Sequence, residues 1–149
     1  VFSYLAIHPE LQQLLANDPG KIDDTMTEFM RRFPVVSDSR ELRQDVELDG
    51  VILKKRDMIM ASTIPIAMSP RSNPEPLEFR LERKVRRHSV FGRGAHTCPG
   101  MYLARLELKI VLTEWFKRIP SFRLAEGTGL SFTSGIVATV DPFTLAWDV

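Results

Sequence analysis

The chain contains 149 residues, of which 44% are hydrophobic and 26% are charged, and its formal net charge is +1. This composition is typical of a globular chain that buries about two-thirds of its unfolded surface, and it excludes fibrous and low-complexity classes. The longest uncharged runs, 58–70 and 127–140, are too short to form a transmembrane helix. A single cysteine excludes an internal disulfide and agrees with a reducing compartment. The opening Val-Phe-Ser-Tyr-Leu is not a signal peptide and reads like a helix entered partway along.

Basic residues concentrate in residues 80–93, which contain six of them against one acidic residue, Glu82. Such a basic segment is most often a solvent-exposed face with no further role. The next most common interpretations are a binding surface for an anionic protein and one for a nucleic acid. Composition does not choose among these. The six basic side chains are Arg80, Arg83, Lys84, Arg86, Arg87 and Arg93.

In the first third of the chain, the spacing of apolar residues predicts two helices. The first lies within 2–16 and is interrupted near Pro9, and a turn follows at 17–20. The second helix covers 23–33, where two aspartates favour its start, and Pro34 ends it.

The middle of the chain predicts small β-elements and a long loop. Alternating residues on both sides of Asp49-Gly50 predict a hairpin over 46–53. Residues 58–70 predict a short strand followed by a short helix. From 69 to 93 there is little periodicity, and we expect a meandering loop that is functional or tightly packed.

The last third begins with the strongest predicted helix, over 101–118, and ends in short strands joined by turns over 121–149. The sequence therefore predicts a mainly α chain with small β-sheets, an α+β class. The apolar stripe that we expect the long helix to bury contains Leu103, Ala104, Leu108, Val111, Leu112, Trp115 and Phe116.

The most informative stretch is residues 91–100, Phe-Gly-Arg-Gly-Ala-His-Thr-Cys-Pro-Gly, which runs directly into the long helix. Cys98 lies one turn before the helix N-terminus, where unpaired N–H groups and the helix dipole stabilise a thiolate. His96 and Arg93 add positive charge beside an anion. Three glycines leave room for a flat bulky ligand or a tight turn: Gly92, Gly94 and Gly100.

Each of these features also has a simpler interpretation. A lone cysteine is more often an inert buried residue, and the glycines lack the full spacing of dinucleotide or P-loop patterns. A zinc site needs about four ligands. A Cys98–His96 nucleophile is conceivable, although a catalytic base usually comes from elsewhere in a fold. The whole supply of imidazole and thiol ligands is His8, His88, His96 and Cys98.

Taken together, residues 91–100 resemble the haem-thiolate signature of the cytochrome P450 family, Phe-x-x-Gly-x-(basic)-x-Cys-x-Gly, which is complete here. The family's second motif, Glu-x-x-Arg, occurs at Glu28 and Arg31, 70 residues before Cys98. The order of elements is most similar to the soluble bacterial camphor hydroxylase and its terpenoid-oxidising relatives. The resemblance implies the C-terminal part of the P450 fold and a cytoplasmic location.

This resemblance assigns roles to residues around a haem b cofactor. Cys98 would be the metal ligand, binding iron as a thiolate. His96 would bond a haem propionate, together with Arg40, whose guanidinium matches a carboxylate bidentately. The remaining cofactor-binding residues would be Phe91 on the cysteine side of the porphyrin, Asp38, Gly92 and Gly94.

The resemblance also implies a structural ion-pair network and a substrate-facing wall. Glu28 and Arg31 would pair in the interior with an arginine of the meander, for which Arg83 is the best-placed candidate. None of these three is expected to be catalytic. Arg56 stands where close relatives have glycine, so we expect strain in that turn. The residues lining the substrate side would be Val36, Ile136 and Val137.

The implied parent enzyme is a monooxygenase that inserts one atom of dioxygen into a small apolar, terpenoid-like substrate. Electrons would come from a ferredoxin-type iron–sulfur donor, or else a flavodoxin, docking on the cysteine face near the basic segment 80–93. The oxygen-activating central helix would precede residue 1, so that 1–149 is the haem-ligating portion of a larger domain and is inactive alone. Two alternatives remain: a haem-free remnant that binds nothing, and a basic nucleic-acid-binding module around 80–93.

Overall fold

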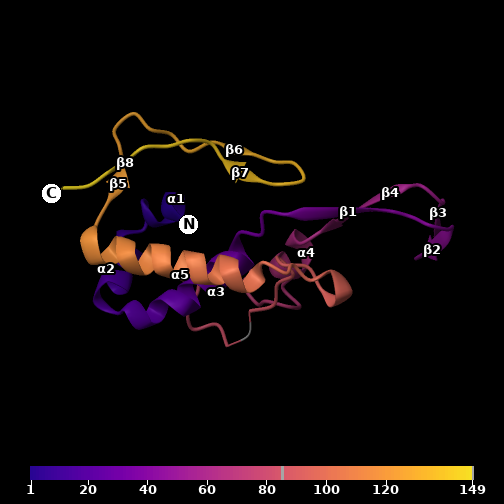
Figure 1. The fold of residues 1–149 in the computed structure, drawn as a ribbon, viewed down its shortest axis with the longest axis horizontal. Helices are drawn as coiled ribbons and strands as arrows, with labels where there is room; N and C mark the ends of the chain where they lie inside the picture. The colour runs from indigo at the N-terminus through magenta and orange to yellow at the C-terminus, as the bar shows by residue number, and fades with distance from the viewer. Residues whose placement is uncertain (85, 149) are drawn as a thin grey trace.

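The computed structural model describes residues 1–84 and 86–148. Short helices form the first third of the chain and lie beside one long helix (Figure 1). The helix predicted over 2–16 is broken before Pro9, as expected, and the second helix ends just before Pro34. These elements are α1 (Phe2–Leu5), α2 (Pro9–Asn17), the 3-10 turn η1 (Pro19–Lys21) and α3 (Ile22–Arg32).

Two antiparallel strand pairs follow, and they extend away from the helices (Figure 1). The predicted hairpin is confirmed: β2 (Val46–Leu48) pairs with β3 (Val51–Leu53). Asp49 and Gly50 in its turn have φ angles of 50° and 80°, the positive values that a tight hairpin turn requires. The other pair joins β1 (Ser37–Glu41) to β4 (Met58–Ser62), after which comes α4 (Ile64–Met68). Strand β1 has no counterpart in the sequence analysis.

The long loop is confirmed, because 69–84 and 86–93 contain no helix or strand. A 3-10 turn, η2 (Gly94–His96), leads into α5 (Met101–Arg118), whose bounds equal those predicted. The tail forms the expected short strands in two antiparallel pairs. They are β5 (Arg123–Leu124) with β8 (Leu145–Ala146), and β6 (Phe132–Thr133) with β7 (Thr139–Val140); residue 149 of the predicted tail lies outside the described residues.

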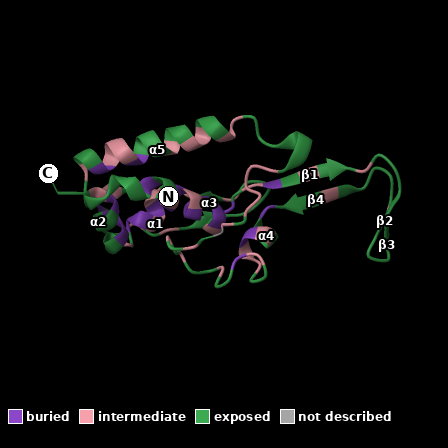
Figure 2. Cartoon of the chain, turned by 90° about the horizontal axis from the view of Figure 1, so that it is seen from below, coloured by how far each residue is buried: buried purple, intermediate pink, exposed green. Residues whose placement is uncertain are grey.

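The core lies where α1, α2 and α3 pack against the second half of α5 (Figure 2). Leu112 and Phe116 of α5 are buried there. The prediction of a continuous buried stripe was wrong at Leu103 and Val111, which are 59% and 46% exposed. The physical reason is that periodicity identifies apolar positions, but burial requires a neighbouring element, and the described residues cover only one side of α5. Among them, no helix combines the length and apolar character needed to cross a bilayer.

Candidate functional site

The loop 91–98 is closed by backbone hydrogen bonds that present Cys98 immediately before α5. The N–H of Cys98 donates to the carbonyl of Phe91 at 2.8 Å, and the N–H of Met101 donates to the carbonyl of Cys98 at 3.3 Å. Cys98 is a free cysteine and is exposed. The fold therefore offers one accessible sulfur donor beside a helix N-terminus, where a thiolate is stabilised.

Gly92 is the position in this loop where a side chain would do most harm. Its φ angle is +72°, and a Cβ atom there would lie 3.2 Å from the carbonyl oxygen of His96. Gly94 also has a positive φ angle, +69°. The sharp turn that brings Cys98 back to Phe91 thus depends on residues without a Cβ atom.

Cationic side chains surround His88, which lies just before the loop. Burial lowers the pKa of His88, and the charges of Arg105, Arg93 and Arg31 lower it further. The guanidinium carbon of Arg105 also lies 6.0 Å from the ring centroid of Phe91. The buried Nδ1 of His88 and Nε of Arg105 have no hydrogen-bond partner within the described part of the chain. Burial, and then these three positive charges, therefore favour the neutral form of the His88 imidazole.

This environment predicts how His88 changes the pH dependence of stability. Between its lowered folded pKa and its ordinary value of about 6.5, the unfolded chain binds more protons, so stability falls as pH falls. When the pH is lowered from about 7.5 to about 5.5, we expect the melting temperature of His88→Gln and of His88→Phe to fall by less than that of the wild type. Thermal unfolding of the full-length protein at both pH values measures this. A drop equal to that of the wild type in both variants would contradict the prediction.

Glu28 and Arg31 lie one turn apart on α3 and form a bidentate ion pair. The Nε atom of Arg31 donates to Oε2 of Glu28 at 2.9 Å, and Nη2 donates to Oε1 at 2.7 Å. Both side chains are 0% exposed. A buried charge is tolerated when it is paired and hydrogen-bonded, and this geometry meets both conditions.

The meander brings further cations and donors to Glu28. The Nε of Arg83 donates to Oε1 at 3.3 Å, and the backbone N–H of Arg80 donates to the same oxygen at 3.1 Å. The Nε of Arg86 lies 3.6 Å from Oε2, while its Nη1 donates to Asp24 at 3.0 Å. The structure thus brings together the ion-pair residues that the sequence analysis grouped, and it adds Arg86, which that analysis missed.

Arg31 also fastens the meander through backbone carbonyls. Its Nη1 donates to Pro76 at 2.7 Å and to Ala67, at the end of α4, at 3.3 Å. Its Nη2 donates to Glu78 at 2.9 Å. One buried guanidinium therefore connects α3, α4 and the meander.

These contacts reduce the free basic surface of the segment 80–93. Arg80 forms an ion pair with Glu75. The side chains of Arg83 and Arg86 are only 6% and 13% exposed, because they turn inward to Glu28. Half of the basic side chains are therefore engaged, and the exposed residues that remain are Lys84, Arg87 and Arg93.

The three polar residues expected at the haem propionates lie in two places. Arg40 and Asp38 share strand β1, where Nη2 of Arg40 lies 3.2 Å from Oδ2 of Asp38, and both side chains are about half exposed. His96 is exposed in η2. Within the described residues, no hydrogen bond joins His96 to this pair. His96 and Arg40 carry N–H groups that can donate to an outside acceptor, whereas the carboxylate of Asp38 only accepts and is paired with Arg40.

Val36 lies 100 residues before Ile136 in sequence, and the fold places it beside Ile136 and Val137. Val36 forms an antiparallel bridge with Val137, and the N–H of Ser37 donates to the carbonyl of Ile136 at 2.8 Å. The side chains of Ile136 and Val137 are 62% and 52% exposed. They form an apolar wall on the tail, joined to the chain that leaves α3.

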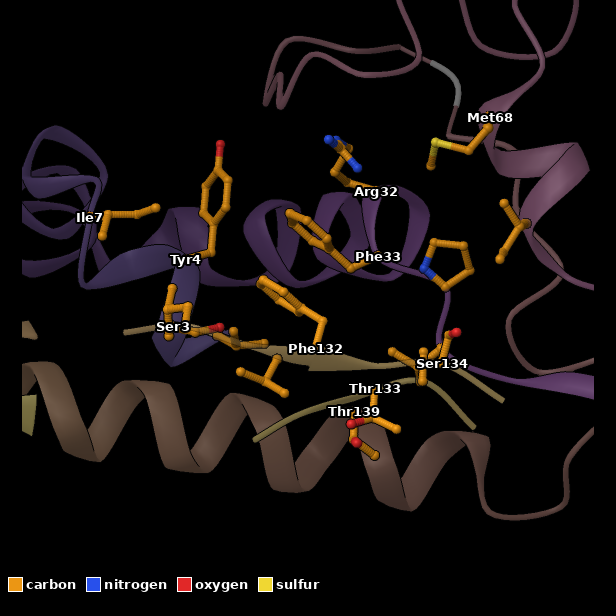
Figure 3. Close-up of a pocket in the computed structure, with 17 residues that line it drawn as sticks. Ser3, Tyr4, Ile7, Arg32, Phe33, Met68, Phe132, Thr133, Ser134 and Thr139 are labelled. Atoms are coloured by element: carbon orange, nitrogen blue, oxygen red, sulfur yellow. The ribbon is translucent and has the colours of Figure 1, made fainter. Parts of the chain in front are cut away.

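A cavity of about 470 Å³ lies between α1, the end of α3 and the tail (Figure 3). Its walls include Tyr4, Phe33 and Phe132. Val35 and Ala138, the immediate neighbours of the bridged valines, also line it. Within the described residues, the lining does not include Val36, Ile136 or Val137, so the apolar wall and this cavity are separate features.

Comparison with known proteins identifies the family in which the ion pair, the meander and the Cys98 loop occur together. The family model described as Cytochrome P450 matches residues 22–127, which include the Glu28–Arg31 pair, the meander and the loop of Cys98. The chain belongs to the cytochrome P450 family. Members of this family are haem-dependent monooxygenases, and membership implies a haem cofactor.

Individual relatives agree with this P450 assignment. The chain is 34% identical over 145 residues to "Probable cytochrome P450 127A1" of Sinorhizobium fredii, covering 97% of this chain and 35% of the relative. It is 30% identical over 121 residues to "6-deoxyerythronolide B hydroxylase" of Saccharopolyspora erythraea, covering 80% and 30%.

Solved P450 structures have the same fold. The crystal structure of CYP101J2 is similar with a TM-score of 0.94 and 54% identity, covering 99% of this chain and 38% of that one. The crystal structure of CYP101C1 has a TM-score of 0.91 and 36% identity, with the same coverage. The chain therefore spans only 30% to 38% of the length of these four relatives.

The donor set around Cys98 fits a haem iron. Haem iron needs only an axial ligand from the protein, and Cys98 offers one exposed sulfur. Metals held by the protein alone need several ligands, and the described residues contain no cluster of three or more histidine, cysteine or acidic side chains that could hold one. A Cβ atom on Gly100 would lie 3.7 Å from the Cys98 sulfur, so glycine there keeps the sulfur uncovered.

Proposed function

We propose that this chain is the haem-ligating C-terminal portion of a P450 monooxygenase, with Cys98 as the axial ligand of haem b. The observation that carries the proposal is the exposed Cys98 sulfur, held before α5 by the hydrogen bond from its N–H to Phe91. Bound haem would supply dioxygen activation, favoured by electron donation from the thiolate. Phe91 would pack on the same side, His96 and Arg40 would donate hydrogen bonds to the propionates, and Asp38 would belong to the same network through its pairing with Arg40.

The ion-pair network has a supporting role in this proposal. Because Arg31 and Arg83 connect Glu28 to the meander, they hold the segment that leads to the Cys98 loop. No proton transfer or bond cleavage is assigned to them. They act on the reaction only by keeping the ligand loop in position.

The substrate class proposed is a small apolar, terpenoid-like molecule. Support comes from the apolar wall of Val36, Ile136 and Val137, in which Ile136 and Val137 are exposed and Val36 is half-buried, and which offers contacts for hydrocarbon and no charge. These residues would orient the substrate by shape and exclude water from it. The central helix and the roof of the pocket would come from residues before Val1, in a cytoplasmic full-length protein.

The experiment begins with the coding sequence upstream of Val1. The encoded full-length protein should bind haem b and, when reduced under carbon monoxide, show the red-shifted Soret band of a thiolate ligand. Binding without that band, or no haem binding, would overturn the proposal and favour a haem-free remnant. We expect residues 1–149 alone to bind haem poorly, because the opposite face of the porphyrin would be uncovered.

A ferredoxin-type electron donor is proposed as partner, and a flavodoxin is the alternative. Arg87 and Arg93 are exposed in the segment that leads to Cys98 and can complement an acidic partner. Complementary charge acts mainly on the association rate and is screened by salt. We expect replacement of both with glutamate to slow reduction by a ferredoxin at low ionic strength, with a defect that shrinks as salt rises.

Stopped-flow reduction at several salt concentrations measures this effect. The control is Arg43→Glu, an exposed arginine between β1 and β2, which should leave reduction and its salt dependence unchanged. Arg83 and Arg86 are excluded, since their contacts with Glu28 would mix a docking defect with a folding defect. Unchanged reduction at low salt with weakened substrate binding would contradict the proposed docking surface.

A further inference from the structure

Asn73 is a fully buried amide in the meander that the proposed chemistry does not use. Its side chain is 0% exposed. The two hydrogens of Nδ2 are shared among the carbonyls of Ile66 at 3.1 Å, Ala67 at 3.2 Å and Arg87 at 2.8 Å. The Oδ1 atom accepts from the N–H of Arg87 at 3.0 Å. Both polar atoms of the amide are thus paired with backbone groups.

These hydrogen bonds join two parts of the chain that no strand pairing connects. On one side is the end of α4, where Ala67 also accepts a hydrogen bond from the buried guanidinium of Arg31. On the other side is Arg87, whose N–H and carbonyl are both bound to Asn73. A continuous path of contacts therefore runs from Glu28 through Arg31, Ala67 and Asn73 to Arg87.

Arg87 is the last point at which this path fixes the backbone before the ligand loop. It lies 11 residues before Cys98, and the loop proper closes four residues later, where Phe91 accepts the hydrogen bond from Cys98. Clamping both backbone polar groups of Arg87 restricts where the loop begins. The position of the first residues of the loop 91–98 then determines the position of the Cys98 sulfur relative to α3.

We propose that Asn73 is a positioning residue for the Cys98 thiolate, acting through Arg87; this rests on the proposed function of Cys98 as iron ligand. Only an amide satisfies this position as found, because it must donate to carbonyls and accept from an N–H with a side chain of this length. Leucine has a similar size but would leave the N–H of Arg87 and the three carbonyls without this partner. Buried backbone groups without a hydrogen-bond partner favour local opening of the meander, because water can then pair with them.

The test compares Asn73→Leu with Gln12→Leu in the full-length protein. Gln12 is also a buried amide, 2% exposed, which donates to the carbonyls of Leu5 and Phe122 and accepts from the N–H of Phe122. It lies on α2, near the C-terminal end of α5, whereas Cys98 precedes the N-terminal end (Figure 1). The two variants therefore remove the same kind of contact at opposite ends of the long helix.

Two readouts separate positioning from general destabilisation. The first is hydrogen exchange of a peptide covering 91–98, which we expect to become about tenfold faster in Asn73→Leu and to stay unchanged in Gln12→Leu. The second is the fraction of reduced, carbon monoxide-bound haem with the red-shifted thiolate band, which should fall in Asn73→Leu only. Should that variant fail to fold, Asn73→Ser replaces it: its hydroxyl is polar but too short to bridge α4 and Arg87, so the same two changes are expected.

The outcomes distinguish this inference from the proposed function. A wild-type protein without the thiolate band overturns the proposed function itself. A wild type with the band, together with an Asn73 variant of unaltered exchange and unaltered band, overturns the positioning role alone. Equal changes in the Asn73 and Gln12 variants, at equal loss of melting temperature, overturn it as well.

Discussion

Replacing Cys98 with alanine in the full-length protein should abolish the red-shifted Soret band of the reduced, carbon monoxide-bound form. The described residues offer one exposed sulfur donor at the loop before α5, and alanine leaves the iron without it. Because the N–H of Cys98 bonds Phe91 through the backbone, the loop should keep its closure in the variant. Loss of the band would therefore report loss of the ligand, and not of the fold.

Two further variants sharpen this measurement. Cys98→Ser keeps the size of the side chain but replaces the sulfur, so it should lose the band as completely as alanine. Thr97→Ser is the matched control, since the hydroxyl of Thr97 donates to the carbonyl of Gly94 and serine can keep that bond. A Cys98→Ala protein that retains the band would rule out this cysteine as the ligand. Loss of the band in Thr97→Ser would show that the loop is too sensitive for the comparison.

The sequence predicted those elements whose signals are local. The Asp49-Gly50 turn, the proline that begins α2 and the proline after α3 each act within a few residues, and the structure follows them. Arg56 confirms the expected strain, since it has a φ angle of 75° where glycine is the favoured residue. Strand β1 was missed because Ser-Asp-Ser-Arg-Glu shows no apolar alternation. Pairing with β4, more than a dozen residues later, makes it a strand.

The residues of the candidate site could be predicted from the sequence where they are contiguous in the chain. Residues 91–100 carry their pattern in one stretch, and the structure folds that stretch into one loop. Asn73 left no signal, since a single asparagine in a loop is ordinary and only tertiary packing buries it. Arg86 was misplaced for a related reason: a run of basic residues indicates charge, but not which members turn inward to a buried carboxylate such as Glu28.

Glu28→Ala in the full-length protein should lower the free energy of unfolding by about 3–5 kcal/mol, the typical cost of breaking a buried ion pair. The carboxylate accepts from Arg31, from Arg83 and from the backbone of Arg80, and it is 0% exposed. Its removal leaves the buried guanidinium of Arg31 without a counterion. Because a typical domain has only about 5–15 kcal/mol of stability, most of the variant should be misfolded and free of haem. Denaturant unfolding and haem content per chain measure both effects.

Glu114→Ala provides the control, because Glu114 also lies on a helix and pairs with cations three and four residues later, Lys117 and Arg118. That pair is exposed to solvent, so its removal should leave unfolding and haem content close to the wild type. Glu28→Gln should fall between the two, since an amide oxygen can still accept hydrogen bonds but carries no charge. Near-normal stability and haem content in Glu28→Ala would mean that the cluster around Arg31 contributes no more than a surface salt bridge. The meander would then be held by other contacts, such as the hydrogen bonds of the buried Asn73 amide.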